Sequence, residues 1–433
     1  MKRTLGAALK AWKDDPLRKP LILIGARQVG KSYLARQLGK SFESFVEINF
    51  ELQPSAKVLF SGDLDLKTLI SKLRAYTEKS IEVGKTLLFL DEIQECEPAL
   101  LALRAFKEEL PELHVIAAGS LINFSLKKVG IPVGRVEFRY VYPLSFEEYL
   151  AAIGKENLRD YAHRQVVDSP FHEMLLDEIS QYMWLGGMPA VVDAWIQFQD
   201  PSRCQAIQDD LLSAYRRDFL KYAKAHQIPY VEKVFSGVAY QIAQKFKYVE
   251  VDRDVKSLLL KQALDLLKDA EIVHLVLHSS AQGLPLSANQ DDRRFKVFFF
   301  DIGLLQRLRN LSLKDWLLKS LSIAHVGAMS EQFVAQEYIA YQDPRKPAEL
   351  FYWHREAAQS NAEIDFIFVR EGQIFPVEVK SSAAGHLKSL HEFLRTHPQC
   401  QKALKISEQK EGSQENLEIL SFYKIFAWLK GPF

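Results

Sequence analysis

Short apolar runs alternate with amphipathic stretches through the first part of the chain. The apolar runs are LILI (21–24), FVEINF (45–50), TLLFLD (86–91) and HVIAA (114–118). Uninterrupted apolar strands between helical patterns are typical of a parallel sheet that helices cover on both faces. We therefore predict an α/β domain over residues 1–154.

The helical period dominates from residue 155 onward. KSLLLKQALDLLKDA (256–270) predicts a helix, and the apolar segments IVHLVLH (272–278) and FKVFFFD (295–301) predict a strand pair around a turn. Helices followed by a hairpin fit a winged-helix module, and they fit equally a plain helical connector that ends in a hairpin. Both interpretations stay open for residues 155–315.

A third unit is predicted over residues 316–433. The segment EQFVAQEYIAYQ (331–342) predicts a helix, and a strand pair and a mixed α/β tail follow it. The chain length agrees with this division, because 433 residues at about 150 per domain make three domains.

Composition narrows the class of protein. The chain is 48% hydrophobic and 26% charged, as expected of a globular protein, and 56 basic against 55 acidic residues leave a net charge of +1. This balance excludes a basic coat for nucleic acid over the whole surface, although it allows a local basic groove.

The 3 cysteines lie far apart, so we expect neither a disulfide framework nor a zinc site. No apolar run is long enough to span a membrane, and the expected location is the cytoplasm.

Residues 25–32, GARQVGKS, match the phosphate-binding pattern GxxxxGK[ST]. An apolar run precedes the pattern and a helical pattern follows it, which is the context that this loop requires. Its backbone N–H groups and the helix N-terminus would hold a phosphate chain, Lys31 would neutralise the β- and γ-phosphates, and the Ser32 hydroxyl would ligate Mg²⁺. ATP and Mg²⁺ are the expected cofactors. The expected nucleotide contacts are Gly25, Ala26, Arg27, Gln28, Val29, Gly30, Lys31, Ser32 and Tyr33.

Two further strand ends would complete the nucleotide site. Asp91 and Glu92 end an apolar run, so Asp91 would position Mg²⁺ and Glu92 would act as general base for the attacking water. Ser120 follows the next run and would sense the γ-phosphate, or it simply ends a strand. Arg135 and Arg139 are candidates for the arginine that stabilises the transferring phosphoryl group, in the same subunit or a neighbouring one, or they are structural.

The third unit contains a second candidate site. EIDFIFV (363–369) alternates polar and apolar residues, and a hairpin with FPVEVK (375–380) would bring Asp365, Glu378 and Lys380 together. Two carboxylates can hold Mg²⁺, and a lysine can orient water for attack on a phosphodiester. The alternative is a cluster of salt bridges in a domain that only binds. The pattern resembles the PD-(D/E)xK nucleases, whose additional acidic residue Glu331 would match.

Several motifs together resemble one family, the prokaryotic AAA-type ATPases that carry the C-terminal domain of unknown function numbered 4143. The resemblance implies an AAA+ core that binds and hydrolyses nucleotide, and a restriction-endonuclease-like α/β domain at the C-terminal end. The motifs are GARQVGKS (25–32), LLFLDEIQ (87–94), AAGS (117–120), GRVEFRYVYPLSFEEYL (134–150), YMWLGGMPAVV (182–192), FFFDIGLL (298–305) and EQFVAQEY (331–338).

Two basic or aromatic segments bear on nucleic acid. The run Arg293–Lys296 beside the predicted hairpin would contact phosphates, or Asp291 and Asp292 would neutralise it. The run Tyr352–Arg355 would stack on bases, or it forms a core strand. The leading hypothesis is a Mg²⁺-dependent ATPase that remodels or translocates DNA, either as a single chain or as a homo-oligomer. Its alternatives are a nucleotide switch with a protein partner and an ATP-gated nuclease.

Overall fold

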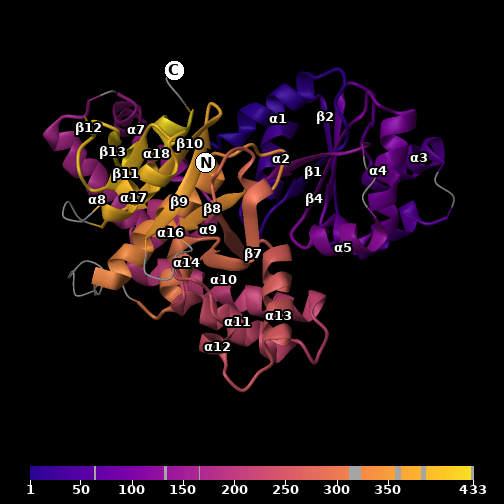
Figure 1. The fold of residues 1–433 in the computed structure, drawn as a ribbon. Coiled ribbons are helices and arrows are strands. Elements are labelled where there is room, and N and C mark those ends of the chain that lie inside the picture. The colour runs from indigo at the N-terminus through magenta and orange to yellow at the C-terminus, as the bar shows by residue number, and fades with distance from the viewer. Residues whose placement is uncertain are drawn as a thin grey trace.

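The structure, a computed structural model, describes residues 1–62, 65–130, 134–164, 166–311, 323–355, 362–381 and 387–430. The N-terminal domain and the C-terminal sheet lie side by side, and helices from the middle of the chain lie below and between them (Figure 1). The domain boundary expected after residue 315 falls outside the described residues.

Five parallel strands form the N-terminal sheet, in the order β2-β3-β4-β1-β5. Each of the four apolar runs predicted as strands is a strand. The strands are β1 (Leu21–Ile24), β2 (Ser44–Asn49), β3 (Thr86–Asp91), β4 (His114–Gly119) and β5 (Glu137–Tyr140).

Helices cover both faces of this sheet. Side chains alternate along β1, so Leu21 and Leu23 belong to one buried cluster and Ile22 and Ile24 to another on the opposite face. This confirms the predicted parallel α/β core. The helices are α1 (Leu5–Asp14), α2 (Lys31–Gly39), α3 (Leu66–Thr77), α4 (Glu97–Glu109) and α5 (Ile122–Val129), with 3₁₀ turns η1 (Pro54–Phe60) and η2 (Ile93–Glu95).

The middle of the chain is helical. One of the two buried clusters extends from α1 and α2 through these helices into the C-terminal sheet, so the three parts share one core. The helices are α6 (Phe146–Ala152), α7 (Glu156–Ala162), α8 (Ser169–Leu185), α9 (Pro189–Phe198), α10 (Pro201–Tyr222), α11 (Ile228–Tyr240), α12 (Tyr248–Val251), α13 (Ser257–Asp269) and α14 (Ile302–Leu308).

A mixed sheet of eight strands lies in the C-terminal part, in the order β12-β13-β11-β10-β9-β8-β6-β7. The predicted strand pair is the antiparallel hairpin of β9 and β10. The strands are β6 (Val273–Ser279), β7 (Gln290–Phe299), β8 (Leu350–His354), β9 (Glu363–Arg370), β10 (Gln373–Val379), β11 (Ala403–Ser407), β12 (Gly412–Gln414) and β13 (Leu417–Ser421). The remaining elements are α16 (Ile323–Ala340), α17 (Lys388–Thr396), α18 (Ile425–Lys430), η3 (Leu286–Asn289) and η4 (Phe422–Lys424).

The hairpin of β6 and β7 belongs to this sheet. β6 pairs with β7 on one side and in parallel with β8 on the other, so the hairpin connects the middle segment with the C-terminal strands. The sequence showed the hairpin but not this pairing, since pairing with β8 depends on residues far along the chain. The winged-helix interpretation stays a prediction.

The length of the apolar helices bears on membrane spanning, and the state of the cysteines bears on disulfides. Within the described ranges, no helix combines the length and apolar character that crossing a bilayer requires. Cys96, Cys204 and Cys400 are buried free thiols.

Candidate functional site

Two glycines shape the phosphate loop between β1 and α2. A Cβ at Gly25 would lie 2.1 Å from the carbonyl oxygen of Val141, so this position has no room for a side chain. Gly30 precedes α2 with φ of 102°, a left-handed conformation that favours glycine. The loop therefore needs a glycine at both positions that the sequence pattern marks.

Lys31 lies inside this loop. Its side chain is buried, and Nζ donates hydrogen bonds to the carbonyl oxygens of Gly25 at 2.9 Å and Ala26 at 2.7 Å. Burial lowers the pKa of Lys31 to about 8. A phosphate chain beside the ammonium would counter that effect, because a neighbouring negative charge favours the protonated form.

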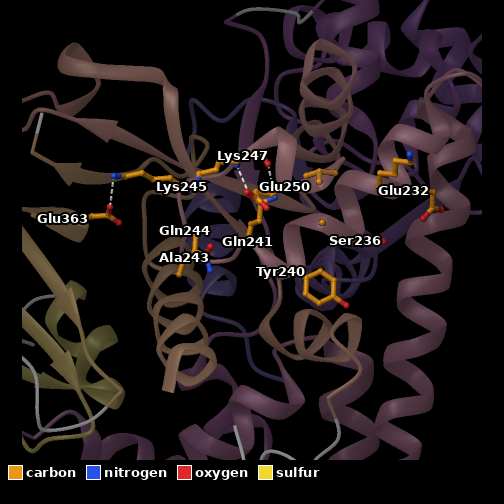
Figure 2. Close-up of a pocket in the computed structure, with 13 residues that line it drawn as sticks. Glu232, Ser236, Tyr240, Gln241, Ala243, Gln244, Lys245, Lys247, Glu250 and Glu363 are labelled. Carbon is orange, nitrogen blue, oxygen red and sulfur yellow. Dashed lines mark hydrogen bonds and ion pairs between the residues drawn. The ribbon is translucent and has the colours of Figure 1, made fainter. Parts of the chain in front are cut away.

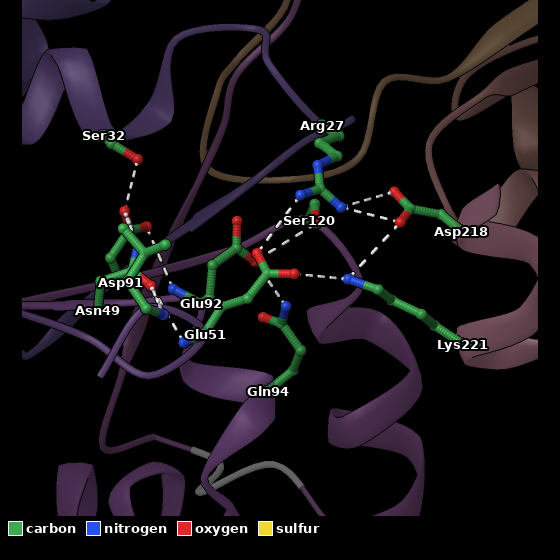
Figure 3. A network of polar contacts seen from close by, with 11 residues as sticks. Arg27, Ser32, Asn49, Glu51, Asp91, Glu92, Gln94, Ser120, Asp218 and Lys221 are labelled. Carbon is green, nitrogen blue, oxygen red and sulfur yellow. Dashed lines mark hydrogen bonds and ion pairs between the residues drawn. The ribbon is translucent and has the colours of Figure 1, made fainter. Parts of the chain in front are cut away.

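Ser32 and Asp91 meet where the loop faces the end of β3. Ser32 Oγ donates to Asp91 Oδ2 at 2.8 Å, and Asn49 Nδ2 donates to the same oxygen at 3.1 Å (Figure 3). Burial raises the pKa of Asp91. A hydroxyl and a carboxylate are the oxygen ligands that Mg²⁺ takes beside nucleotide phosphates, so these two side chains fit the ion. The sequence did not indicate Asn49, which comes from the end of the neighbouring strand β2.

Glu92 is held by two neighbours. Its Oε2 accepts hydrogen bonds from Gln94 Nε2 at 2.6 Å and from Ser120 Oγ at 3.4 Å (Figure 3). A Cβ at Gly119 would lie 2.0 Å from Gln94 Oε1, so a glycine at the end of β4 makes room for this amide. The structure thus brings together the predicted residues Glu92 and Ser120, and adds Gln94.

Arg27 links the phosphate loop to α10. Its Nη1 contacts Asp218 Oδ1 at 2.8 Å, its Nη2 lies 3.4 Å from Glu51 Oε2, and Lys221 binds both carboxylates (Figure 3). The Tyr215 hydroxyl donates to the Arg27 carbonyl at 2.5 Å. The sequence alone did not reveal the partners in α10, because 188 positions separate Arg27 from Tyr215 and 191 separate it from Asp218.

Four further residues of this segment are predicted to contact nucleotide: Ala26, Gln28, Val29 and Tyr33. Ala26 and Val29 are buried, and Gln28 adopts φ of 63°. The Tyr33 hydroxyl accepts from the N-terminal amine at 2.8 Å, and it donates to the carbonyl of Met1 at 2.9 Å. Nucleotide contact by these four side chains remains a prediction.

Neither candidate arginine contacts the phosphate loop through the bonds described for it. Arg135 is half-exposed and pairs with Glu108 at 2.8 Å. Arg139 is buried, donates to the carbonyl of Phe138 at 2.7 Å and pairs with Glu137 at 3.2 Å. A role for Arg135 in a neighbouring subunit remains a proposal.

The hairpin of β9 and β10 brings the predicted C-terminal residues together. Asp365 Oδ2 accepts from the backbone N–H of Val379 at 2.8 Å, and Lys380 Nζ lies 2.5 Å from Glu378 Oε1. Burial raises the pKa of both carboxyl groups. Glu378 Oε2 is buried and has no hydrogen-bond partner.

A lysine that the sequence did not single out for this site lies among the carboxylates. Lys296 Nζ from β7 lies 2.8 Å from Glu363, 3.4 Å from Glu331 and 3.8 Å from Asp365. Burial opposes its charge, but these three carboxylates outweigh burial and raise the pKa of Lys296. The signal in the sequence was weak: one lysine in an apolar strand, FKVFFF.

The C-terminal cluster fits a divalent metal poorly. One oxygen of Asp365 binds a backbone N–H, and the other faces Lys296. No group of three or more His, Cys, Asp or Glu side chains is arranged to hold a metal ion in the described part of the chain. The cluster therefore matches the salt-bridge alternative more closely than a metal centre.

The two segments predicted to contact DNA make contacts within the chain: the arginines form ion pairs, and the aromatic side chains are buried. Arg293 and Arg294 both pair with Asp291, at 3.2 and 3.4 Å. Tyr352 and Trp353 are buried in β8, which makes this run a core strand.

Family-typical segments meet at Asp301. This buried carboxylate accepts from the N–H groups of Gly187 at 2.7 Å and Leu304 at 2.9 Å, and a Cβ at Gly186 would lie 2.3 Å from Asp301 Oδ1. Leu144 in turn donates its N–H to the Gly187 carbonyl at 2.7 Å. Three motifs distant in sequence thus form one structural junction.

Family models match three parts of the chain. An AAA domain matches residues 17–150, a domain of unknown function (DUF8612) matches 176–315, and a domain of unknown function (DUF4143) matches 326–425. The matches thus assign an AAA domain to the N-terminal part and a DUF4143 domain to the C-terminal part, in the order that the motifs indicate. The AAA match implies nucleotide binding and supports a nucleotide-hydrolysing enzyme.

Individual relatives are distant. Uncharacterized protein Mb2031c of Mycobacterium bovis and uncharacterized protein Rv2008c of Mycobacterium tuberculosis are each 24% identical over 379 residues, covering 84% of this chain and 71% of theirs. Among solved structures, the Walker-type ATPase paby2304 of Pyrococcus abyssi is 16% identical, with a TM-score of 0.44 over 70% of this chain and 94% of that one.

Proposed function

We propose that the chain hydrolyses ATP with Mg²⁺ at the phosphate loop. One observation carries the proposal: Ser32 Oγ, in the first turn after the loop, lies 2.8 Å from the Asp91 carboxylate at the end of β3. A hydroxyl and a carboxylate so placed, beside the buried Lys31, form a cation site next to a phosphate site.

Each side chain has a separate task. Lys31 binds the phosphate chain, and Ser32 and Asp91 would hold Mg²⁺, which neutralises phosphate charge when bound. Glu92 accepts the proton of the attacking water, and Gln94 and Ser120 orient its carboxylate.

The role of Ser32 is tested by Mg²⁺ dependence. Ser32→Ala should raise the Mg²⁺ concentration needed for half-maximal ATP turnover by about tenfold, because one oxygen ligand is lost. Ser41→Ala is the matched control, since the Ser41 hydroxyl donates to the Leu38 carbonyl and accepts from Lys13 Nζ, away from the phosphate loop, at the end of the same helix. An unchanged Mg²⁺ requirement in Ser32→Ala would refute this assignment.

We propose further that ATP turnover serves action on DNA, as remodelling or translocation. The arrangement of Asp365, Glu378 and Lys380 on adjacent strands supports this, since it resembles the site of nucleases that bind DNA. ATP turnover should rise with single-stranded, duplex or branched DNA. A rate that none of them changes would favour the alternative, a nucleotide switch that binds a protein partner.

In a homo-oligomer, Arg135 would stabilise the transferring phosphoryl group at the nucleotide site of a neighbouring subunit. The side chain is half-exposed, so it is accessible to a neighbouring subunit, where it would contact the nucleotide. Mixing Arg135→Ala with Lys31→Ala subunits should then restore part of the turnover that each lacks alone. No restoration would argue against a shared site.

A further inference from the structure

The C-terminal cluster has an internal cation. Lys296 is 1% exposed and lies within ion-pair distance of Glu331, Glu363 and Asp365. Its ammonium also lies 5.4 Å from the centre of the Tyr352 ring. A buried charge of this kind is stable only where partners of opposite sign surround it.

We propose that the Lys296 ammonium takes the position that a divalent metal occupies in a metal-dependent nuclease, and that this site therefore binds no metal and cleaves no phosphodiester. The chain itself supplies the positive charge that these carboxylates need.

The available oxygen atoms support this proposal. A divalent ion such as Mg²⁺ or Ca²⁺ takes about six or more oxygen ligands. Both oxygens of Asp365 already have partners, and Glu378 offers only Oε2, because its Oε1 binds Lys380. Asp365 and Glu378 together thus leave a single carboxylate oxygen without a partner, so both cannot bind a divalent ion unless an existing contact is broken.

Charge balance supports it as well. The carboxylates of Glu331, Glu363, Asp365 and Glu378 face the ammonium groups of Lys296, Lys380 and Lys245. Lys245 reaches Glu363 at 3.2 Å from the wall of a cleft of about 1150 Å³ between the helical region and the sheet (Figure 2). With all seven groups charged, the four carboxylates and three ammonium groups sum to −1; a divalent ion would reverse this sign to +1 and would meet Lys296 at close range.

Lys296 also has a structural role, because it comes from a different part of the fold than its carboxylate partners. Lys296 comes from β7, whereas its partners come from α16 and β9. The ion pairs of Lys296 therefore connect the hairpin of β6 and β7 to α16 and β9. A metal ion bound by the carboxylates would not make this connection, because it is not covalently part of β7.

The experiment measures Mn²⁺ binding by calorimetry in the 433-residue chain with Asp91→Asn, which removes the carboxylate that would hold a divalent ion at the nucleotide site. This parent should bind no Mn²⁺ that depends on Asp365. Adding Lys296→Met should create a Mn²⁺ site at least about tenfold tighter than any in the parent, and Asp365→Asn should abolish it. Lys380→Met is the matched control, because Lys380 pairs with Glu378 at the edge of the cluster, and it should create no such site.

Two results would overturn the proposal. One is a Mn²⁺ ion in the parent that Asp365→Asn removes. The other is a folded Lys296→Met variant that gains no Mn²⁺ affinity. If Lys296→Met does not fold, the parent titration with and without Asp365→Asn decides the question alone.

Discussion

Arg27 of the phosphate loop forms an ion pair with Asp218 of α10, with Nη1 and Oδ1 2.8 Å apart. The Tyr215 hydroxyl, one helical turn earlier, binds the carbonyl of the same arginine. A change of loop conformation on nucleotide binding would therefore act directly on a 22-residue helix that packs against α9, α11 and α14. This contact connects the nucleotide site directly with the helical region.

The pair should make an energetic contribution to ATP binding. Arg27→Ala and Asp218→Ala should each weaken ATP affinity, and the double variant should be no weaker than the worse single one, because both remove the same interaction. A double-mutant cycle on the ATP dissociation constant should give a coupling of about 1–3 kcal/mol. The exposed pair Arg36–Glu47 is the control and should show no coupling to ATP. Additive effects of Arg27 and Asp218 would contradict the link.

The Gln94 amide should be needed for turnover. Gly119→Ala places a Cβ where the amide lies, so Gln94 must move away from Glu92. We expect kcat to fall by about tenfold with little change in KM, since the change affects the general base and not phosphate binding. Steady-state kinetics measure this. Gly6→Ala is the control, because a Cβ there meets nothing within 4 Å; equal kcat in Gly119→Ala and Gly6→Ala would disprove the role.

The nucleotide site could be predicted largely because its main residues are local. Gly25 and Gly30 lie in the loop between β1 and α2, Lys31 and Ser32 begin α2, and the positions of the strands along the chain follow from the apolar runs. Asp91 was predictable too, since the ends of parallel strands meet at one edge of the sheet. Asn49, Gln94 and Asp218 were not, because their roles depend on neighbours that only the fold brings close.

The C-terminal site could be predicted less completely, because one of its central residues comes from a distant strand. The alternation of Glu363 to Val369 correctly places Glu363 and Asp365 together, beside Lys296, and the hairpin brings Asp365 and Glu378 together. It wrongly groups Ile364 with Phe366 and Phe368, which pack in another buried cluster, because the pairing of β9 with β8 is irregular there. The pattern cannot show that β7 pairs into the same sheet, and so it cannot show that Lys296 lies among these carboxylates. A metal site and a salt-bridge cluster therefore have the same signature in the sequence.

Glu271 should make stability depend on pH. Burial raises the pKa of Glu271 from 4.5 to about 7, so the folded chain holds its proton over a range where the unfolded chain has lost it. Its contribution is present below about pH 4.5 and is lost as the pH rises to about 7. In Glu271→Gln, stability relative to wild type should rise by about 3 kcal/mol across that range, measured by urea unfolding at several pH values. A difference that does not vary with pH would rule out this titration.

Asp301 should be a key determinant of stability. Asp301→Ala leaves the N–H groups of Gly187 and Leu304 without their acceptor in a buried position, and should lower the free energy of unfolding by about 2–4 kcal/mol. Asp301→Asn keeps one oxygen acceptor and should lose less. Urea unfolding checks both variants. A loss in Asp301→Ala no greater than in Asp301→Asn would show that the hydrogen bonds are not the cause.

The most direct test of ATP hydrolysis at this site compares wild type, Lys31→Ala and Glu92→Gln. ATP binding and ATP turnover are measured on each protein with Mg²⁺, and Lys40→Ala, an exposed lysine after the same helix, is the control. The account predicts that Lys31→Ala loses both binding and turnover, and that Glu92→Gln binds ATP but turns it over at least about a hundredfold more slowly than wild type. Turnover in Glu92→Gln at the wild-type rate, or ATP binding in Lys31→Ala equal to that of Lys40→Ala, would contradict it.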